Sequence, residues 1–531
     1  MDRSDYLFDP AAHTDRSVLR GLTTRAALAA TSAAVPDGLA YVDGPLRLTW
    51  AQVPSLVSSL AEVLLTMGVG PGDVVGLHLA NGANYAVAHL AIAEIGAVTL
   101  PLHAPYRRAE LAQLLAATDA VACVVPEAAL PMMNALRDEL PALRLIVRAH
   151  DPIGYAAGGR RPPARTLPRQ LDPDAPFALV PTSGTESPAP KLCMHTADGL
   201  LSNAQAFVEE SGMSASDVLI VGSGFTHLFG LLGLHMALLS GATLLPLRRF
   251  EARAFLELAA GEGATRAWAV PAQLVDLLAA APLGSALRVR EIRTAGAAVG
   301  AELVGALRAA FGAEVTVHWG MSELGGGITT YGRDPLAMPD AIGTPIAGAQ
   351  VRVVREDGND AAPGEIGELW YRRADLFRGY YRAPEKTAAA VTPDGWLRTG
   401  DLAALETDGV VRFAGRAKDL VNRGGFKISA VELESLLSGH AAIRRCAIVA
   451  VPDARLGEKA CLVAELHDGA VLALDEVAAF LDARDVAKYK WPEYLLLIEA
   501  LPMTATNKIA KGTLRALAVE RCLGETARHA S

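Results

Sequence analysis

The amino-acid sequence predicts an α/β protein with more than one domain. Helix-like and strand-like apolar segments alternate through residues 48–319, and β-rich segments broken by glycine and proline follow from about Gly343. Such alternation produces parallel strands covered by helices on both faces of a sheet. The length of 531 residues also exceeds what one ordinary hydrophobic core supports. We therefore expect a large N-terminal domain of doubly wound α/β subdomains, a β-rich subdomain, and a small α+β C-terminal domain.

The alternation runs in two rounds, separated by a loop rich in glycine, proline and arginine at residues 152–176. Apolar residues recur at helical spacing in some segments and form short continuous runs, typical of buried strands, in others. In chain order we expect a helix over 50–67, a strand over 74–79, a helix over 85–95, a strand over 97–100, a helix over 108–117, a strand over 120–125, a helix over 198–210, a strand over 218–221, a helix over 228–239, and strands over 267–270, 291–294 and 315–319.

The sequence pattern changes twice after the second round of helix–strand alternation. It becomes β-rich first and then, near Gly415, takes the form of a compact α+β module of roughly 100 residues. We therefore place an N-terminal domain at 1–415 and a C-terminal domain at 416–531. The elements expected in these regions are strands over 350–354 and 367–371, helices over 430–438 and 474–482, and strands over 443–451 and 460–465.

Composition and charge exclude several classes of protein. Hydrophobic residues make up 51% of the chain and charged residues 20%, as in a soluble globular protein. The formal net charge of −9 argues against a general nucleic-acid binder, because no block concentrates lysine and arginine. The five cysteines are scattered and never spaced C-x-x-C, which favours a reducing compartment and disfavours a zinc site.

Neither a secretory signal nor a membrane span is expected. The first residues lack a basic segment followed by an apolar one. The most apolar window, 85–102, is interrupted by His89 and Glu94 and is better explained as a buried helix running into a strand. We expect a cytoplasmic protein.

Residues 180–191 (VPTSGTESPAPK) have the composition of a phosphate-binding loop. Thr182, Ser183 and Thr185 offer hydroxyl donors. Gly184 allows backbone amides to point inward, and Lys191 adds a mobile positive charge. The spacing is not that of a Walker loop, and taken alone the stretch could also be a plain surface turn.

Five polar clusters follow one another along the chain, at residues 182–191, 318–323, 396–401, 415–428 and 502–508. Each motif is weak by itself, but their order and separations together are specific. Over roughly residues 45–515 the chain resembles the adenylate-forming superfamily, in its branch of acyl-CoA synthetases and other acid–thiol ligases. Its motifs are similar to those of cyclohexanecarboxylate, medium-chain and aryl acyl-CoA ligases.

The resemblance implies a site for ATP with magnesium. In the HWGMSE motif, Trp319 would lie against adenine and Glu323 would bind Mg²⁺, whose other positions phosphate oxygens and waters can fill. Asp401 would hold the ribose hydroxyls, with Arg416 near the ribose. The residues assigned to ATP or AMP are Thr182, Ser183, Gly184, Thr185, Lys191, Gly296, Ala297, Ala298, His318, Trp319, Gly320, Met321, Ser322, Asp401 and Arg416.

The same resemblance makes Lys508 the catalytic lysine of the adenylation step. Lys508 follows Pro-x-Thr at 502–504, with Asn507 in place of the family's usual glycine. A cation that spans the attacking carboxylate and the α-phosphate acts chiefly by electrostatic catalysis. Glu323 and His227 are the other two catalytic candidates.

Residues 225–230 (FTHLFG) resemble the F-H-x-x-G segment of acyl-CoA ligases, which implies that His227 stands between the acyl pocket and the thiol channel. A core histidine is the alternative. The glycines at 325–327 leave room beside Trp319, so we expect a roomy, mostly apolar pocket for a bulky alicyclic, aromatic or medium-chain acid. The residues assigned to this pocket are His227, Leu228, Gly296, Gly320, Gly325 and Gly326.

Two further motifs imply a moving C-terminal domain. Lys418, in GRAKD at 415–419, resembles the hinge residue whose backbone torsions change when the domain swings. The loop NRGGFKI at 422–428 resembles the one that lines the pantetheine tunnel after the swing. The residues assigned to the thiol channel are Gly424, Gly425, Phe426 and Lys427.

The predicted function is a two-step ligation that uses ATP, Mg²⁺ and coenzyme A as co-substrate, by a monomer or a homodimer. One alternative acceptor is the pantetheine thiol of an acyl or aryl carrier protein. A degenerate, non-catalytic nucleotide-binding protein is a remote alternative. The extra residue within 188–190 also leaves open whether Lys191 keeps the usual phosphate contact.

Overall fold

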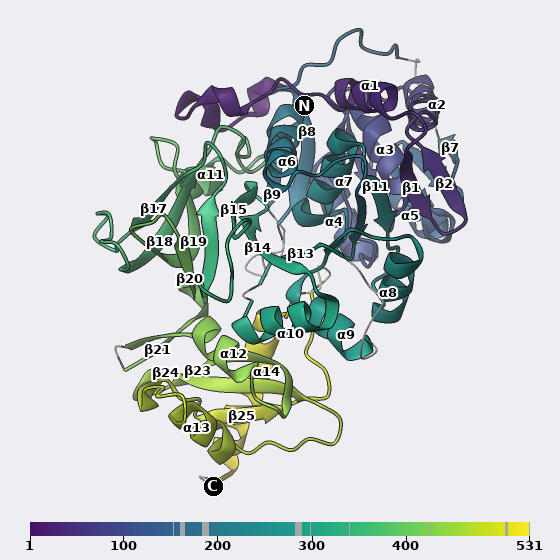
Figure 1. The fold of residues 1–531 in the computed structure, drawn as a ribbon. Helices are drawn as coiled ribbons and strands as arrows, with labels where there is room; N and C mark the ends of the chain where they lie inside the picture. The colour runs from purple at the N-terminus through teal and green to yellow at the C-terminus, as the bar shows by residue number, and fades with distance from the viewer. Residues whose placement is uncertain are drawn as a thin grey trace.

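The computed structural model describes residues 1–151, 153–159, 165–182, 191–281, 289–297, 299–338, 340–424, 426–504 and 508–529. Figure 1 shows a large N-terminal part and a smaller C-terminal part, the latter coloured light green to yellow. The chain passes between them at the 3-10 turn Ala417–Asp419. This mixed α/β architecture confirms the fold class predicted from the sequence.

A seven-stranded sheet belongs to the first α/β subdomain, with strand order β7-β6-β5-β3-β4-β8-β9 in the described chain. The five inner strands run parallel, and β7 and β9 pair antiparallel at the two edges. β3 and β4 are buried along their whole length, as expected for strands covered on both faces. The strands are β3 (Val74–Leu77), β4 (Val98–Pro101), β5 (Ala122–Pro126), β6 (Leu145–Ala149), β7 (Tyr155–Gly159), β8 (Pro176–Pro181) and β9 (Leu192–Thr196).

A second sheet passes from a parallel half into an antiparallel half without a break in strand pairing. β1, β11, β10, β12, β13 and β14 pair parallel, and β15, β16, β20, β19, β18 and β17 then follow as antiparallel neighbours. The β-rich region is therefore continuous with the second α/β subdomain. The strands are β1 (Leu39–Asp43), β2 (Leu46–Thr49), β10 (Val218–Val221), β11 (Thr243–Pro246), β12 (Arg266–Trp268), β13 (Glu291–Ala295), β14 (Glu314–Met321), β15 (Gly325–Thr329), β16 (Ala341–Pro345), β17 (Gln350–Val354), β18 (Ile366–Arg372), β19 (Leu397–Leu405) and β20 (Val411–Arg416).

Helices fill the space between the two sheets and cover their outer faces. α1, α2, α3, α6 and α7 share one apolar cluster with strands of both sheets and so form a central layer. α4 and α5 pack on the outer face of the first sheet, and α8, α9 and α10 on that of the second. No helix in the described chain is both long and apolar enough to cross a bilayer. The helices are α1 (Thr24–Ala34), α2 (Val53–Thr66), α3 (Ala83–Glu94), α4 (Arg108–Ala117), α5 (Leu130–Glu139), α6 (Ala197–Ser211), α7 (Leu228–Ser240), α8 (Ala252–Gly261), α9 (Pro271–Ala280), α10 (Ala301–Phe311) and α11 (Pro384–Ala390).

The C-terminal part is a separate sheet of order β22-β21-β24-β23, with β25 beside β24. α12 and α13 cover one face of this sheet and α14 covers the other. The helices and strands expected over 430–482 all occur, with small shifts at their ends. The elements are β21 (Leu420–Arg423), β22 (Phe426–Ser429), α12 (Ala430–Leu437), β23 (Ile443–Asp453), β24 (Gly457–Leu466), α13 (Leu474–Asp482), β25 (Tyr494–Leu497) and α14 (Lys511–His529).

Two arginines of β23 hold the C-terminal part against α9, which lies beside it in Figure 1. Arg444 and Arg445 reach the same oxygen of Asp276, at N–O distances of 3.1 and 2.5 Å. Arg445 also donates to the Ala272 carbonyl oxygen at 3.2 Å. These contacts bridge the two parts far from the connecting turn, so they favour the arrangement seen here.

Replacing Asp276 with asparagine should loosen this contact. The change removes the carboxylate that both arginines share, and part-exposed pairs of this kind contribute about 1 kcal/mol, so the undocked population should rise about fivefold. Limited proteolysis at residues 416–419 measures that population. Asp482→Asn, at the exposed end of α13, is the control, and equal cleavage rates in both variants would contradict the role of Asp276.

Candidate nucleotide and acid site

The expected phosphate loop leaves the first sheet at the carboxyl end of β8. The Thr182 N–H donates to the Lys191 carbonyl oxygen at 2.8 Å and closes the base of the loop. Ligands of open α/β sheets bind at the carboxyl ends of strands, so the loop starts in a suitable place. Ser183, Gly184 and Thr185 lie outside the described residues.

A tyrosine connects the end of this loop to Glu323. The Tyr380 hydroxyl donates a 2.6 Å hydrogen bond to Oε1 of Glu323, and Nζ of Lys191 lies 4.8 Å from the centre of the tyrosine ring. Glu323 is buried in the turn between β14 and β15. Burial raises the pKa of Glu323, and the tyrosine hydroxyl and two nearby cations, Lys191 and Arg416, oppose that rise. The site thus holds a buried carboxylate beside positive charge.

Trp319, Asp401 and Arg416 form a second connected group. The indole Nε1 of Trp319 donates to Oδ2 of Asp401 at 2.8 Å, and Nε of Arg416 lies 2.9 Å from Oδ1 of Asp401. Asp401 and Arg416 are directly opposite each other on β19 and β20. Both carboxylate oxygens are engaged, which fixes the orientation of Asp401 between the two side chains.

Lys508 enters the N-terminal part from the C-terminal part. The loop that carries it is closed by a hydrogen bond from the Thr504 N–H to the Lys508 carbonyl oxygen at 2.7 Å. A Cβ added at Gly296 would lie 2.9 Å from Cε and 3.4 Å from Nζ of Lys508, and φ of Gly296 is +94°. Burial lowers the pKa of Lys508 to about 8; the charge of Arg416 lowers it further, and that of Asp401 opposes the change. The lysine therefore lies over Gly296, close to the Asp401–Arg416 pair.

His227 faces the same region from the N-terminus of α7. Its ring stacks on His103 at a centroid distance of 4.4 Å, and His103 in turn contacts the Thr226 hydroxyl at 2.6 Å. Burial lowers the pKa of His227 well below its usual range, and the charges of His103 and Lys508 lower it further. His227 is thus a neutral ring within electrostatic range of Lys508, and Leu228 after it is buried.

The glycines expected to leave open space are instead in close contact with their neighbours. A Cβ at Gly326 would lie 2.3 Å from the His318 ring and 2.4 Å from Phe207, and one at Gly325 would lie 2.8 Å from Asn203. A Cβ at Gly320 would lie 1.9 Å from the Gly325 carbonyl oxygen. The expectation of a roomy pocket beside these glycines is therefore wrong, because side chains of α6 and β14 occupy that space.

His318 does not join the nucleotide-binding residues to which the sequence analysis assigned it. It packs against Phe207 and Phe229, at centroid distances of 4.6 and 5.9 Å, whereas its neighbour Trp319 reaches Asp401. Adjacent strand residues point to opposite faces, so β14 separates His318 from the nucleotide group. Of the other assigned residues, Ala297 is exposed just after β13, and Met321 and Ser322 lie at the turn that carries Glu323.

The loop at residues 422–428 of the C-terminal part, called the glycine loop below, lies away from Lys508, Asp401 and Arg416. Gly424 is in the turn between β21 and β22, Phe426 stacks on Tyr489 at 4.6 Å, and Lys427 pairs with Glu356. Lys418 is in the connecting turn Ala417–Asp419. Ala298 and Gly425 lie outside the described residues. In this arrangement Lys508, and not the glycine loop, faces the N-terminal part.

The sequence analysis missed Tyr380 and the buried Arg378 beside it. The Arg378 N–H donates to the Met194 carbonyl oxygen at 2.6 Å, and its guanidinium pairs with Asp9 and Asp174. The N-terminal segment therefore helps to fix the segment that carries Tyr380. An arginine within the aromatic run LFRGYY (376–381) was the available signal, because a buried charge needs charged partners.

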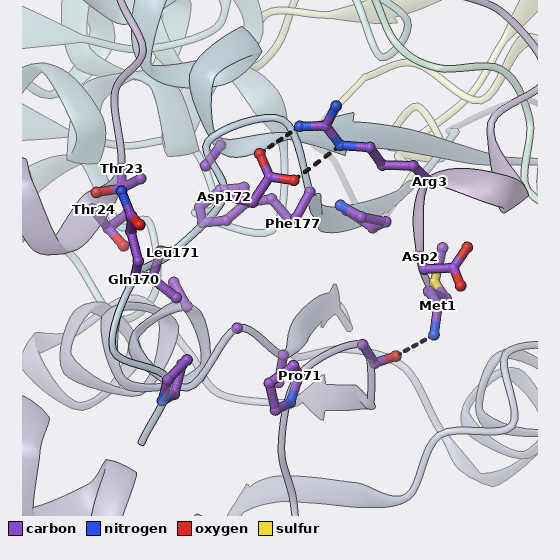
Figure 2. Close-up of a pocket in the computed structure, with 18 residues that line it drawn as sticks. Met1, Asp2, Arg3, Thr23, Thr24, Pro71, Gln170, Leu171, Asp172 and Phe177 are labelled. Carbon is purple, nitrogen blue, oxygen red and sulfur yellow. Dashed lines mark hydrogen bonds and ion pairs between the residues drawn. The ribbon is translucent and has the colours of Figure 1, made fainter. Parts of the chain in front are cut away.

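A cavity of about 500 Å³ shares no lining residue with this cluster. Figure 2 shows its lining, which includes Met1, Thr23, Asp172 and Phe177. Nε of Arg3 donates to Asp172 at 2.9 Å, and the Met1 ammonium donates to the Gly72 carbonyl oxygen at 2.6 Å. We assign this cavity no part in the site.

Comparison with known protein families gives two matches along the chain. Residues 28–381 match the model described as AMP-binding enzyme, and residues 432–508 match the AMP-binding enzyme C-terminal domain. Together these matches cover most of both parts of the structure. The residues between them, 382–431, include Asp401, Arg416, Lys418 and the glycine loop at 422–428.

Individual proteins are similar to this chain in sequence or structure over most of their length. It is 34% identical over 505 residues to a Streptomyces sp protein named salicylyl-CoA synthase / salicylate adenylyltransferase, covering 90% of each. It is 32% identical over 502 residues to the salicyl-AMP ligase / salicyl-S-ArCP synthetase of Mycobacterium tuberculosis, covering 90% of this chain and 87% of the relative. Among solved structures, ATP-bound MatB from Rhodopseudomonas palustris has a TM-score of 0.84 at 25% identity, covering 94% of this chain and 99% of that one. The chain therefore belongs to the AMP-binding enzymes, the adenylate-forming family that its motifs predict.

Proposed function

We propose that this chain is an ATP-dependent, AMP-forming acid–thiol ligase. In the first step a carboxylate attacks the α-phosphate of ATP, an acyl–phosphate bond forms and pyrophosphate leaves. In the second step the thiol of coenzyme A attacks the acyl carbon, a thioester forms and AMP leaves. The observation that carries the proposal is the position of Lys508, which comes from the C-terminal part and lies over Gly296 beside Asp401 and Arg416.

Lys508 is suited to the first step because that step brings two anions together. The attack adds negative charge around the α-phosphate, and a cation held in a water-poor site stabilises that charge more strongly than it would in water. The same burial destabilises the free ammonium, which accounts for its lowered pKa. Bound ATP and acid would restore the positive charge.

The nucleotide is assigned to the two hydrogen-bonded groups of the site. Trp319 offers a ring for the adenine, and Asp401 with Arg416 offers an acceptor and donors for the ribose. Lys191 offers a charge for the phosphates. Glu323 fits Mg²⁺, which binds one or two carboxylates and completes its shell with phosphate oxygens and waters. When bound, Mg²⁺ would neutralise charge on the polyphosphate.

For the second step we propose a swing of the C-terminal part about Lys418. Lys508 would leave the site, and the loop at 422–427, which lies elsewhere in the present arrangement, would approach the acyl-adenylate. The neutral ring of His227 stands beside the position of Lys508 and would then border the path of the thiol.

Loading of a carrier protein is the second candidate function. It is favoured by the relative named salicyl-S-ArCP synthetase, whereas the segment FTHLFG and the relative named salicylyl-CoA synthase favour coenzyme A. Offering coenzyme A and a pantetheinylated carrier protein in separate reactions, with the same acid and ATP, decides between them by the thioester formed.

Lys508→Ala should lower acid-dependent pyrophosphate exchange by at least about a hundredfold, because it removes the cation at the developing charge. Thioester formation from supplied acyl-adenylate should be largely spared. Lys386→Ala, an exposed lysine on α11, is the matched control. Normal exchange in Lys508→Ala would contradict the assignment.

The adenylation step should weaken as pH rises through about 8. The pKa of Lys508 is lowered to about 8, so the required cation is present below that pH and lost above it. The kcat/KM for ATP, measured by pyrophosphate exchange from pH 6.5 to 9.5, should fall about tenfold per pH unit on the alkaline side. Lys508→Arg stays charged throughout and should lack this fall. A flat wild-type profile up to pH 9.5 would refute the prediction.

Tyr380→Phe should weaken the response to Mg²⁺. It removes the hydroxyl that orients Glu323, and the loss of such a supporting hydrogen bond lowers metal affinity by about 10- to 100-fold. The Mg²⁺ concentration that gives half-maximal pyrophosphate release measures the effect. Tyr381→Phe, the neighbouring substitution, is the control; an unchanged Mg²⁺ response in Tyr380→Phe would rule out the supporting role.

A further inference from the structure

Glu465 is a buried carboxylate of β24 that the proposed mechanism does not use. Its side chain is 4% exposed, and the register of β23 and β24 shifts beside it, so that Arg444 and Arg445 oppose this single residue. Nη1 of Arg444 lies 3.3 Å and Nη1 of Arg445 3.8 Å from Oε1 of Glu465. The two arginines that hold Asp276 of α9 therefore also meet a carboxylate of their own part.

The other oxygen of Glu465 holds the segment that leads to Lys508. The buried N–H of Leu501 donates to Oε2 of Glu465 at 3.0 Å. The segments before and after Lys508 then pair with each other, since the Ala510 N–H donates to the Pro502 carbonyl oxygen at 2.8 Å. Glu465 thus fixes the start of the segment that carries the lysine.

The end of this segment is fixed by a different carboxylate. Nζ of Lys511 lies 2.8 Å from Oε1 of Glu434, which also accepts the Ile448 N–H at 2.6 Å. Glu434 is on α12 and Ile448 on β23, both in the C-terminal part. This second anchor therefore stays within the C-terminal part, whereas Glu465 connects the lysine segment to the contact with α9.

The groups on both sides of Glu465 are hydrogen-bond donors, with arginine N–H groups at Oε1 and the Leu501 N–H at Oε2. A carboxylate accepts at both oxygens, whereas the amide of glutamine accepts at one end and donates at the other. A carboxylate also supplies the negative charge that partly buried guanidinium groups need. The path from Asp276 through the arginines to Leu501 therefore requires a carboxylate at position 465.

We propose that Glu465 is a positioning residue of the adenylation step. It ties the placement of Lys508 to the seating of the C-terminal part on α9, because one carboxylate holds both the docked arginines and the Leu501 N–H. Asp276 stays with the N-terminal part when the C-terminal part swings, so the path is complete when Lys508 is in the site. This inference rests on the proposed ligase function and adds a residue that acts through Lys508.

Glu465→Gln tests the tie, because the amide must turn its NH2 group toward either the arginines or Leu501. Benzoate, cyclohexanecarboxylate and octanoate are offered to the wild type, and the acid with the fastest pyrophosphate exchange is used throughout. In the variant, kcat for pyrophosphate exchange should fall about tenfold and the KM for ATP should change less than about twofold, since a displaced cation affects the transition state more than ground-state binding. Thioester formation from supplied acyl-adenylate should stay within about twofold of the wild type.

Glu499→Gln makes the same change at an exposed residue close to Leu501 and is the control, which should match the wild type in both half-reactions. Wild-type pyrophosphate exchange in Glu465→Gln would overturn the inference. An equal loss in both half-reactions would also overturn it, because that result indicates a general structural defect.

Limited proteolysis at residues 416–419 separates positioning from docking. Glu465→Gln leaves both arginines with Asp276, so the cleavage rate should stay within about twofold of the wild type, whereas Asp276→Asn should raise it about fivefold. An equal rise in Glu465→Gln would mean that the residue acts through docking alone, and would overturn the inference.

Glu465→Asp decides if Glu465→Gln does not fold. It keeps the charge for the arginines, but its side chain is one carbon shorter and cannot hold them and the Leu501 N–H together. Pyrophosphate exchange should fall at least about threefold while thioester formation is spared. Wild-type pyrophosphate exchange in this variant would then overturn the inference.

Hydrogen exchange of the Leu501 amide tests the tie without any substrate. It should be at least about fivefold faster in Glu465→Gln than in the wild type, because a charge-assisted hydrogen bond is weakened. Faster hydrogen exchange in the variant, together with no pyrophosphate exchange by the wild type, would support the tie and contradict the ligase function. Unchanged hydrogen exchange would overturn the tie and leave the ligase function intact.

Discussion

The arrangement of the site depends on the burial of one positive charge. Lys508 is carried by the C-terminal part but lies over Gly296 of the N-terminal part, where an added Cβ would lie 2.9 Å from Cε of the lysine. Taking an ammonium group out of water is unfavourable, as its lowered pKa of about 8 reflects. The contact of Arg444 and Arg445 with Asp276 helps to offset that cost by holding the two parts together.

The buried carboxylate Glu323 places a second constraint on the fold. A carboxylate in a low-dielectric site needs a donor, and Tyr380 provides one. The segment around Tyr380 is fixed by Arg378, whose ion pairs lead to Asp174, just before β8, and to Asp9 near the N-terminus. Asp9 thereby helps to position the segment of Tyr380, which is more than three hundred residues further along the chain. Through Asp174, Arg378 also contacts the residues just before β8, the strand that leads into the phosphate loop.

Buried charges lie on the face of the second sheet that α6 and α7 cover. The glycines at 325–327 allow β15 to pack against His318, Phe207 and Trp319 and leave no open space there. Behind them the charges of Arg293, Glu291 and Glu210 lie on the sheet face under α6. A buried ion-pair network therefore underlies this part of the second sheet, and removal of one partner would leave an uncompensated charge.

The sequence by itself determined the fold class and the chemical types at the site. Helix and strand periodicity is a local property, and a lysine, two carboxylates and a hydroxyl-rich loop in a fixed order are visible without coordinates. Only the tertiary structure decided which side chains meet. The opposite directions of His318 and Trp319 follow from strand geometry, with a register irregularity directly after Trp319, and the pairing of Tyr380 with Glu323 joins segments distant in the chain. Such contacts depend on how strands and helices pack against one another, and no local pattern in the sequence records that packing.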